Sequence, residues 1–322
     1  MINNKKLAML IAVIVGLSLA MPSAYAAKRR YLSIASGWVT GAYYAFSGAV
    51  SRVAWNKLRD KNIKVTSESS GASVANSKLI GAGDTDFALL QNDIASYAYH
   101  GQLMFKKPLK NLLGCFVLYP ESIQIVARKD ANINSVADLK GKRVSLGPVG
   151  SGTVENARQI LAAWGLSEKD MKVQQLKSTQ ASDYMKDGRL DAFFNTTAWP
   201  AAHIMDAHIA VPSHIVPIKG PNADKLLKKY EFYTYDTIPG GLYKGVDQPV
   251  TTVAVMAMMA ARAELEEDVV YWIVKAIYED IEQVKQAHSK LKTLDINKAL
   301  VGMSVPLHPG AAKYFKEAGV LK

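Results

Sequence analysis

The sequence predicts an α/β protein built from two similar lobes with a ligand cleft between them. From residue 30 onward, strand-like and helix-like hydrophobic patterns alternate, which is typical of α/β folds with largely parallel sheets. The order strand, glycine-containing loop, helix occurs at residues 30–58 and again at 143–164. Each half also contains a glycine, an aspartate three residues later and then an apolar strand, at residues 83–89 and 188–194.

The individual elements follow from periodicity and from chain-breaking residues. A 3.6-residue apolar period predicts helices, and short apolar runs between glycine or polar turns predict strands. Strands are expected at residues 30–35, 63–65, 86–90, 112–118, 143–146, 173–176 and 191–194, and helices at 43–58, 153–164 and 181–186, with a short helix after the polar loop 67–73. Asp86 and Asp191 are expected to cap the turns that enter their strands.

The two lobes are expected to share the chain unevenly. Lobe 1 takes residues 27–125 and 253–322, and lobe 2 takes residues 126–252. The chain is expected to cross between the lobes at residues 116–128 and to return at 251–258. An amphipathic helix follows, and its apolar stripe is expected to pack against lobe 1. The stripe consists of Leu265, Val269, Trp272, Ile273, Ala276, Ile277, Ile281 and Val284.

The N-terminus has the three parts of a bacterial-type secretory signal peptide, residues 1–26. Lys5 and Lys6 form a basic region, residues 7–21 are mostly apolar, and Ala24-Tyr25-Ala26 matches an A-x-A cleavage site. The apolar run of about fifteen residues is short for a membrane span. Cleavage after Ala26 is therefore favoured over an uncleaved anchor, and the mature protein is expected to be periplasmic.

Composition narrows the class of partner. The formal net charge is +11, and +9 without the leader, because residues 1–26 contain two lysines and no acid. The lysines are dispersed and no nucleic-acid-binding motif accompanies them, so no nucleic-acid partner is expected, whereas a small anionic ligand fits the charge. Cys115 is the single cysteine and lies in an apolar run, which indicates a buried, inert thiol.

The loop at residues 147–153 is suited to a small anion. It reads Gly-Pro-Val-Gly-Ser-Gly-Thr between a strand and a helix, and the unpaired N–H groups and the dipole at a helix N-terminus favour negative charge. Gly147 and Gly152 have the spacing of a phosphate loop. However, Thr153 and Val154 stand where that loop needs lysine and serine or threonine, so a nucleotide is not expected.

Catalytic and metal-binding patterns are weak. The chain lacks the G-x-S-x-G elbow and the H-E-x-x-H zinc motif. His203 and His208 lie five apart on a possible helix, which is poor geometry for one metal, and spacing pairs no base with Ser151. No catalytic residue, metal or cofactor is expected. Asn195 begins an Asn-Thr-Thr sequon after a strand, and it either lines the cleft or lies in a simple turn.

Several short stretches match a known family, and their order along the chain makes the match specific. They are Tyr43-Tyr44 after a strand and loop, Ser69-Ser70-Gly71-Ala72-Ser73 with Asn76, residues 88–93, 118–121, 136–144, 150–153 and 186–194, and His308-Pro309-Gly310-Ala311. With them, the mature chain resembles the TAXI family of solute-binding proteins, the extracytoplasmic receptors of one branch of TRAP transporters.

The resemblance implies a two-lobed fold of the type II periplasmic-binding-protein class. It also implies a monomer that captures a small organic acid or an amino acid, such as glutamate, and delivers it to TRAP-type membrane subunits. One departure lies before Tyr43, where the family usually has a denser glycine run and this chain has Trp38. Trp38 either narrows the pocket, stacks on the ligand or shields the loop from solvent.

The candidate ligand-binding residues come from both lobes. The predicted mechanism is lobe closure over a carboxylate-bearing ligand, with the hydroxyls of Ser151 and Thr153 on its anionic group. Tyr43 and Trp199 would form apolar walls with polar tips, and Asp93 would either bind a ligand amine or cap a helix. The full set is Trp38, Gly41, Tyr43, Ser70, Ser73, Asn76, Gln91, Asp93, Gly150, Ser151, Gly152, Thr153, Asn195 and Trp199.

Two other classes of function stay open. A periplasmic sensor of the same fold would present its liganded form to a membrane kinase, and a neighbouring kinase gene would favour it over a neighbouring permease gene. A secreted enzyme of the same fold would require a catalytic pair and measurable turnover.

Overall fold

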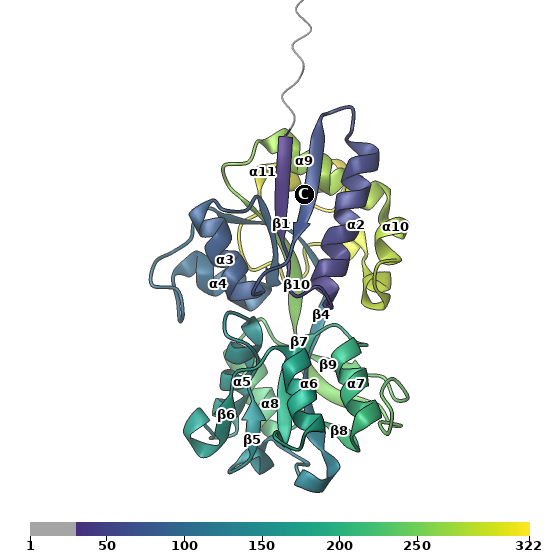
Figure 1. The fold of residues 1–322 in the computed structure, drawn as a ribbon. Helices are drawn as coiled ribbons and strands as arrows, with labels where there is room; N and C mark the ends of the chain where they lie inside the picture. The colour runs from purple at the N-terminus through teal and green to yellow at the C-terminus, as the bar shows by residue number, and fades with distance from the viewer. Residues whose placement is uncertain (1–29) are drawn as a thin grey trace, which may run out of the picture.

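The computed structural model describes residues 30–322 and has two lobes joined by long strands (Figure 1). The predicted signal peptide lies outside the described residues. The strands form one ten-stranded sheet in the order β2-β1-β3-β10-β4-β7-β5-β6, with β8 paired to β4 and β9 paired to β10. The antiparallel strands β4 (Leu112–Arg128) and β10 (Val250–Arg262) run through the narrow waist from one lobe to the other.

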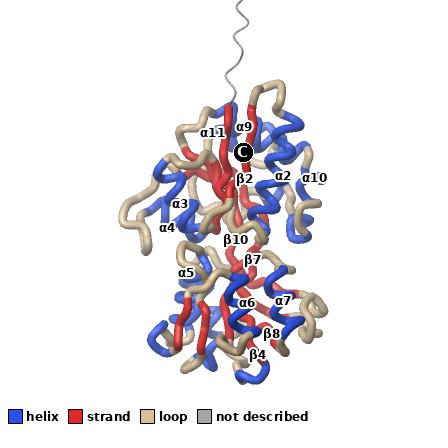
Figure 2. Tube along the Cα trace, viewed as in Figure 1, coloured by secondary structure: helices blue, strands red, loops and turns tan. Residues whose placement is uncertain are grey.

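Lobe 1 packs helices on both faces of its part of the sheet (Figures 1 and 2). One apolar core lies under α2, α9 and α11, and a second lies under α3 and α4. The elements of lobe 1 are β1 (Arg30–Ala35), α2 (Ala42–Lys57), β2 (Ile63–Glu68), α3 (Ser73–Ala82), β3 (Phe87–Gln91), α4 (Asn92–His100), α9 (Glu267–Glu279), α10 (Ile281–Lys285) and α11 (Pro309–Glu317), with 3-10 turns at Ser289–Thr293 and Ile296–Lys298.

Lobe 2 has the same plan. One core lies under α5 and α8, and the other lies under α6 and α7. Its elements are β5 (Arg143–Ser145), α5 (Gly152–Ala163), β6 (Lys172–Gln174), α6 (Ser178–Lys186), β7 (Ala192–Thr197), α7 (Ala202–Ala210), β8 (Ser213–Val216), α8 (Pro221–Lys229) and β9 (Thr234–Ile238), with 3-10 turns at Lys129–Ala131, Val136–Leu139 and Glu168–Asp170.

The sheet is mixed, so the expectation of largely parallel sheets is wrong. β1 pairs in parallel with β2 and β3, and β5 does so with β6 and β7. Pairs that include β4 or β10 are antiparallel, because these two strands run in opposite directions through both lobes. The predicted lobe boundaries at residues 126 and 253 fall within these two strands.

The aspartates of the two repeated motifs join neighbouring strands and do more than cap their own turns. The backbone N–H of Ser33 on β1 donates to Asp86 over 2.9 Å, and that of Arg143 on β5 donates to Asp191 over 2.8 Å. Each carboxylate also accepts from an arginine, Arg262 for Asp86 and Arg143 itself for Asp191. The same device therefore joins β1 to β3 in lobe 1 and β5 to β7 in lobe 2.

The C-terminal apolar stripe predicted at residues 265–284 packs into the core of lobe 1 under α2, as expected. Asp280 divides it into α9 and α10, so the predicted single helix is two. Within residues 30–322, no helix combines the length and the apolar composition that a membrane span requires.

Candidate functional site

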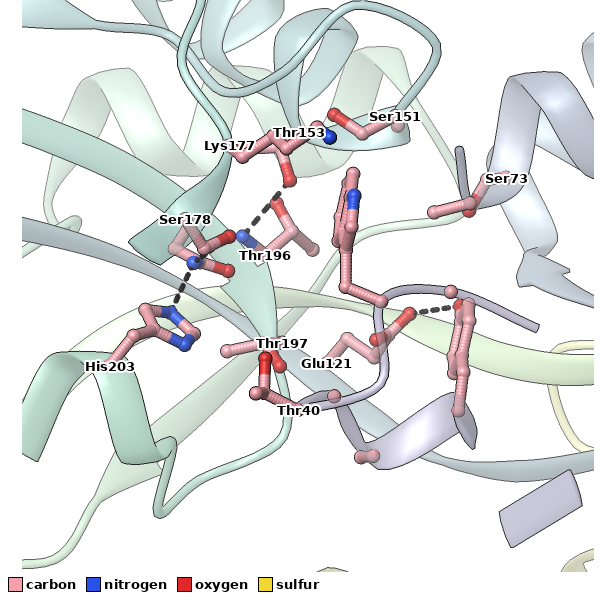
Figure 3. A pocket seen from close by; sticks show the side chains of 18 of the residues that line it. Thr40, Ser73, Glu121, Ser151, Thr153, Lys177, Ser178, Thr196, Thr197 and His203 are labelled. Atoms are coloured by element: carbon pink, nitrogen blue, oxygen red, sulfur yellow. Dashed lines mark hydrogen bonds between the residues drawn. The ribbon is translucent and has the colours of Figure 1, made fainter. Parts of the chain in front are cut away.

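A cavity of about 260 Å³ lies between the two lobes. Lobe 1 and lobe 2 both contribute to its wall, and β4 of the waist contributes Glu121 (Figure 3). The lining residues are Gly37, Trp38, Val39, Thr40, Gly41, Ala42, Tyr43, Ser69, Ala72, Ser73, Gln91, Glu121, Ser151, Gly152, Thr153, Lys177, Ser178, Thr179, Asn195, Thr196, Thr197 and His203.

The first residues of four helices meet at this cavity. Its wall includes residues 41–43 of α2, 72–73 of α3, 151–153 of α5 and 177–179 of α6. The N–H groups of a first helical turn have no intrahelical partner, and the helix dipole places partial positive charge there. In α3, the N–H groups of Val74 and Ala75 already donate to the Gly150 carbonyl. The N-termini of α2 in lobe 1 and of α5 and α6 in lobe 2 are therefore the ones that favour a bound anion.

Two hydroxyls of lobe 2 are oriented as hydrogen-bond donors toward the cavity. The Thr153 hydroxyl accepts from the backbone N–H of Thr196 over 3.3 Å, and the Ser178 hydroxyl accepts from the Asn195 amide over 2.9 Å. Among the described residues these are the bonds that the two hydroxyls make, so each keeps its own hydrogen for a ligand. The Ser151 hydroxyl instead donates to the carbonyl of Pro148 over 2.8 Å, which corrects its expected role.

The charges of the lining side chains also favour an anion. Burial raises the pKa of Glu121 to about 8, although the hydrogen bond from Tyr43 opposes this, and burial lowers the pKa of His203 to about 4. Burial likewise raises the pKa of Tyr43 well above its usual value. At pH 7 Tyr43 and His203 are therefore neutral and the raised pKa of Glu121 favours its protonated form, so among the described residues of the wall Lys177 supplies the positive charge.

The glycine loop before α5 lets lobe 2 approach lobe 1 closely. Gly150 has a φ of +88°, and its carbonyl accepts from the N–H groups of Val74 and Ala75 in the first turn of α3. A Cβ on Gly152 would overlap the side-chain amide of the buried Gln91, so a larger residue here would have to displace that amide. The structure thus shows the lobes in contact on the α3, α4 and α5 side of the cavity.

A buried amide strengthens this contact. Asn156 on α5 is fully buried and donates to the Asp93 carboxylate of lobe 1 over 2.8 Å. Its carbonyl oxygen accepts from the Gln91 amide over 3.1 Å. When the lobes separate, these groups bond to water, and when the lobes meet they bond to one another. The bonds therefore stabilise only the closed arrangement.

Most of the candidates predicted from sequence line the cavity. They are Trp38, Gly41, Tyr43, Ser73, Gln91, Ser151, Gly152, Thr153 and Asn195. Asn195 is 5% exposed and faces the cavity from β7, which excludes the simple-turn alternative. Trp38 is half-buried and lines both this cavity and a more open hollow next to it, so it stands at the mouth.

Asn76 and Asp93 lie outside the cavity, so Asn76 does not line the ligand site, and of the two roles expected for Asp93 the one at the start of α4 agrees with the structure. The Asn76 amide donates to the carbonyls of Ser36 and Leu89, so it holds the loop before α2 in place. Asp93 is fully buried and bonds the backbone N–H of Ile94 and the Asn156 amide. The side chain of Asp93 therefore joins the lobes and does not face a ligand in the cavity.

Ser70, Gly150 and Trp199 also lie outside the cavity. Ser70 donates to the Asn76 carbonyl and lines the outer hollow. The Gly150 carbonyl accepts the hydrogen bonds from the first turn of α3 that are described above. The Trp199 indole N–H donates to Asp236 over 3.3 Å, and the ammonium of Lys290 lies 3.7 Å from its ring centroid. Trp199 therefore packs against a buried lysine of lobe 1 and does not wall the ligand site.

Sequence reasoning missed several lining residues, chiefly Glu121, Lys177, Ser178, Thr196 and His203. A signal existed for Lys177 and Ser178, because the loop from β6 to α6 is the counterpart in lobe 2 of the polar loop from β2 to α3. Glu121 ends the stretch 118–121 that matches the family, but only the fold shows that its side chain faces the cavity from the waist.

His208 and Cys115 are accounted for by packing. His208 stacks on Tyr243 with ring centroids 5.3 Å apart, whereas His203 faces the cavity. Within residues 30–322 no group of three or more histidine, cysteine or acidic side chains could hold a metal ion. Cys115 is fully buried and burial raises the pKa of its thiol, which confirms the inert reading.

Solved structures of periplasmic binding proteins have a similar fold. The fold is similar to that of the periplasmic aliphatic sulphonate binding protein SsuA from Escherichia coli, at 16% identity and a TM-score of 0.50, over 89% of this chain and 83% of that one. It is similar to an ancestral arginine-binding protein bound to arginine, at 15% identity and a TM-score of 0.52, over 82% of this chain and 99% of that one. It is also similar to a Listeria monocytogenes protein assigned as an L-cystine ABC transporter, at 15% identity and a TM-score of 0.50, over 82% of this chain and 97% of that one.

Identities this low show the fold alone, and that fold is the two-lobed α/β fold of periplasmic solute-binding proteins, as the sequence predicted. A family model describes the sequence itself more closely. It matches residues 34–319, which is nearly the whole described chain. The chain therefore belongs to the NMT1-like family.

Proposed function

We propose that this protein is an extracytoplasmic receptor that captures a small carboxylate-bearing solute between its lobes and passes it to a membrane transporter. The observation that carries the proposal is the meeting of the N-termini of α2, α5 and α6 with Lys177 at a cavity whose one carboxyl group, that of Glu121, has a raised pKa. Such a site compensates a negative charge without a metal ion or a basic cluster.

The size and the closure of the site fit a small solute. A volume of about 260 Å³ is near the lower end of ordinary ligand pockets. Direct contact between α3, α4 and α5 would enclose a ligand once the lobes meet, so ligand affinity would include the free energy of closure.

The similar structures support the class of ligand only in outline. Sulphonates are anionic, and arginine carries a carboxylate, so both named ligands have a group that a helix N-terminus can bind. The carboxylate preference, and an organic acid or amino acid as the ligand, come from the TAXI resemblance and remain part of this proposal.

The membrane partner is proposed on the same basis. The TAXI resemblance favours TRAP-type permease subunits, whereas one of the similar structures belongs to an ABC system. A receptor role without turnover is proposed because, within residues 30–322, the Ser151 hydroxyl is bonded to its own loop and His203 is bonded to Asn195. A periplasmic location is proposed from the expected signal peptide, and the similarity in fold to periplasmic binding proteins supports it.

Thermal unfolding and small-angle scattering with a panel of small carboxylates and sulfonates test the proposal. At least one compound should raise the melting temperature and leave the particle as compact as this structure. Lys177→Met should weaken its binding by about 1 kcal/mol or more, and the effect should shrink at high salt. Lys172→Met, which replaces an exposed lysine outside the cavity, is the matched control. If no anion shifts the melting temperature, the proposal fails.

A further inference from the structure

Glu121 is the one carboxyl group on the cavity wall in the described part of the chain, and it lies across the cavity from the anion-favouring groups of lobe 2. It is 4% exposed and projects from β4, which passes through both lobes. Figure 3 shows it across the cavity from Ser151, Thr153 and Lys177. The cavity therefore has one end that favours negative charge and another that presents a carboxyl group.

The surroundings of Glu121 leave its charge uncompensated. The Tyr43 hydroxyl donates to one carboxyl oxygen over 2.6 Å, and no lysine, arginine or histidine within residues 30–322 forms an ion pair with it. The titratable groups that interact with it are Tyr43, the buried phenol of Tyr119 two residues earlier on β4 and, at longer range, the buried carboxyl of Asp93, which disfavours a second negative charge. Lys177 lies on the opposite wall. A buried carboxyl in such a place is held neutral unless a cation arrives.

We propose that Glu121 determines specificity by pairing with an ammonium group on the ligand, so that the receptor selects zwitterions over anions of the same shape. This inference rests on the proposed capture of an anion at the opposite end. On binding, the carboxylic acid of Glu121 gives its proton to solvent, and the resulting carboxylate pairs with the ammonium. The net reaction is uptake of one zwitterion and release of up to one proton, and no other bond changes.

The geometry also explains why a ligand without an ammonium group would gain less binding free energy at Glu121. Tyr43 already supplies a donor to Glu121, and an ammonium adds the opposite charge in a site from which water is largely excluded. An amine-free anion would meet a neutral acid there and gain at most one ordinary hydrogen bond.

Titration calorimetry with matched pairs tests this. L-glutamate is compared with glutarate, and taurine with ethanesulfonate, at pH 7 in two buffers of different ionisation enthalpy. The amine-bearing member of a pair that binds should bind at least tenfold tighter, and the difference in enthalpy between buffers should show proton release. Glu121→Gln keeps the size of the side chain and an oxygen for Tyr43. It should abolish both the amine preference and the proton release, while the amine-free anion binds as before.

The control Glu231→Gln, which alters an exposed glutamate of lobe 2 away from the cavity, should change neither quantity. Equal binding of both members of each pair, or an amine preference that survives in Glu121→Gln, would overturn the inference while anion capture stands. If no member of either pair binds and the wider anion panel also fails, the proposed function itself is wrong. Should Glu121→Gln not fold, the wild-type preference and proton count decide alone.

Discussion

Tyr97 offers a clean test of the contact between the lobes. It lies on α4 of lobe 1, and its hydroxyl accepts from the Gln159 amide on α5 of lobe 2 over 3.0 Å. Its ring also meets Phe232 edge-on, with centroids 5.7 Å apart. Gln159 keeps a second bond to Glu155 in lobe 2, so Tyr97→Phe removes one bond across the lobes and little else.

The expected loss follows from the closure equilibrium. In the open form both groups bond to water, so the deletion costs about 1 kcal/mol in the closed form alone. When the open form dominates without ligand, this weakens apparent affinity by about fivefold. Tyr97→Ala also removes the aromatic pair, for a total of about 2 kcal/mol, or roughly thirtyfold.

Calorimetry with one bound anion measures these changes, and scattering reports the fraction of open protein. Tyr233→Phe is the matched control, because the Tyr233 hydroxyl donates to Gln159 over 2.8 Å and accepts from Asn156 over 3.0 Å, and both partners lie in lobe 2. It should lower the melting temperature and leave the affinity within about twofold. Equal loss of affinity in the two variants, or no loss in Tyr97→Phe, would refute the view that this contact stabilises closure.

Three further predictions concern the loop, the close approach and pH. Thr153→Val should weaken anion binding roughly tenfold in calorimetry, whereas Ser151→Ala should change it little. A larger loss in Ser151→Ala would show that Ser151, and not Thr153, donates to the anion. Gly152→Ala should hinder closure by about 1–3 kcal/mol, seen as a larger radius of gyration with ligand, while Gly48→Ala, which has open space around its new Cβ, should not. Burial raises the pKa of Asp93 from 3.8 to about 7, so the folded protein holds this proton more tightly than the unfolded chain. Unfolding free energy from denaturant titrations should therefore fall as pH rises from about 4 to 7, and Asp93→Asn should flatten that slope; an unchanged slope would contradict the assignment.

Much of the fold was predictable because its signals are local. The strand, loop and helix at residues 30–57 follow from apolar periodicity and a glycine loop, and β10 was expected as a returning strand. The mixed sheet was not predictable in this way, because strand direction depends on which strands pass between the lobes. The Asp280 break within the C-terminal stripe also needs tertiary packing to be seen.

The site was predictable where it rests on backbone geometry and less so where it rests on pairing across the lobes. The first turn of α5 follows from its glycines, and the first turn of α6 could have been found from the internal repeat. Asp93 and Glu121 are both buried carboxyls, and only the fold shows that one faces Asn156 and the other faces the cavity.

The central claim is that the cavity between the lobes holds a small anion, and the bound compound itself is its most direct test. The protein is purified without denaturation and examined by native mass spectrometry, and the released compound is identified and returned to the ligand-free protein in a calorimeter. The account predicts one small anionic compound that binds with one-to-one stoichiometry and more weakly to Lys177→Met. A cationic or uncharged compound that binds equally well to both proteins would contradict it.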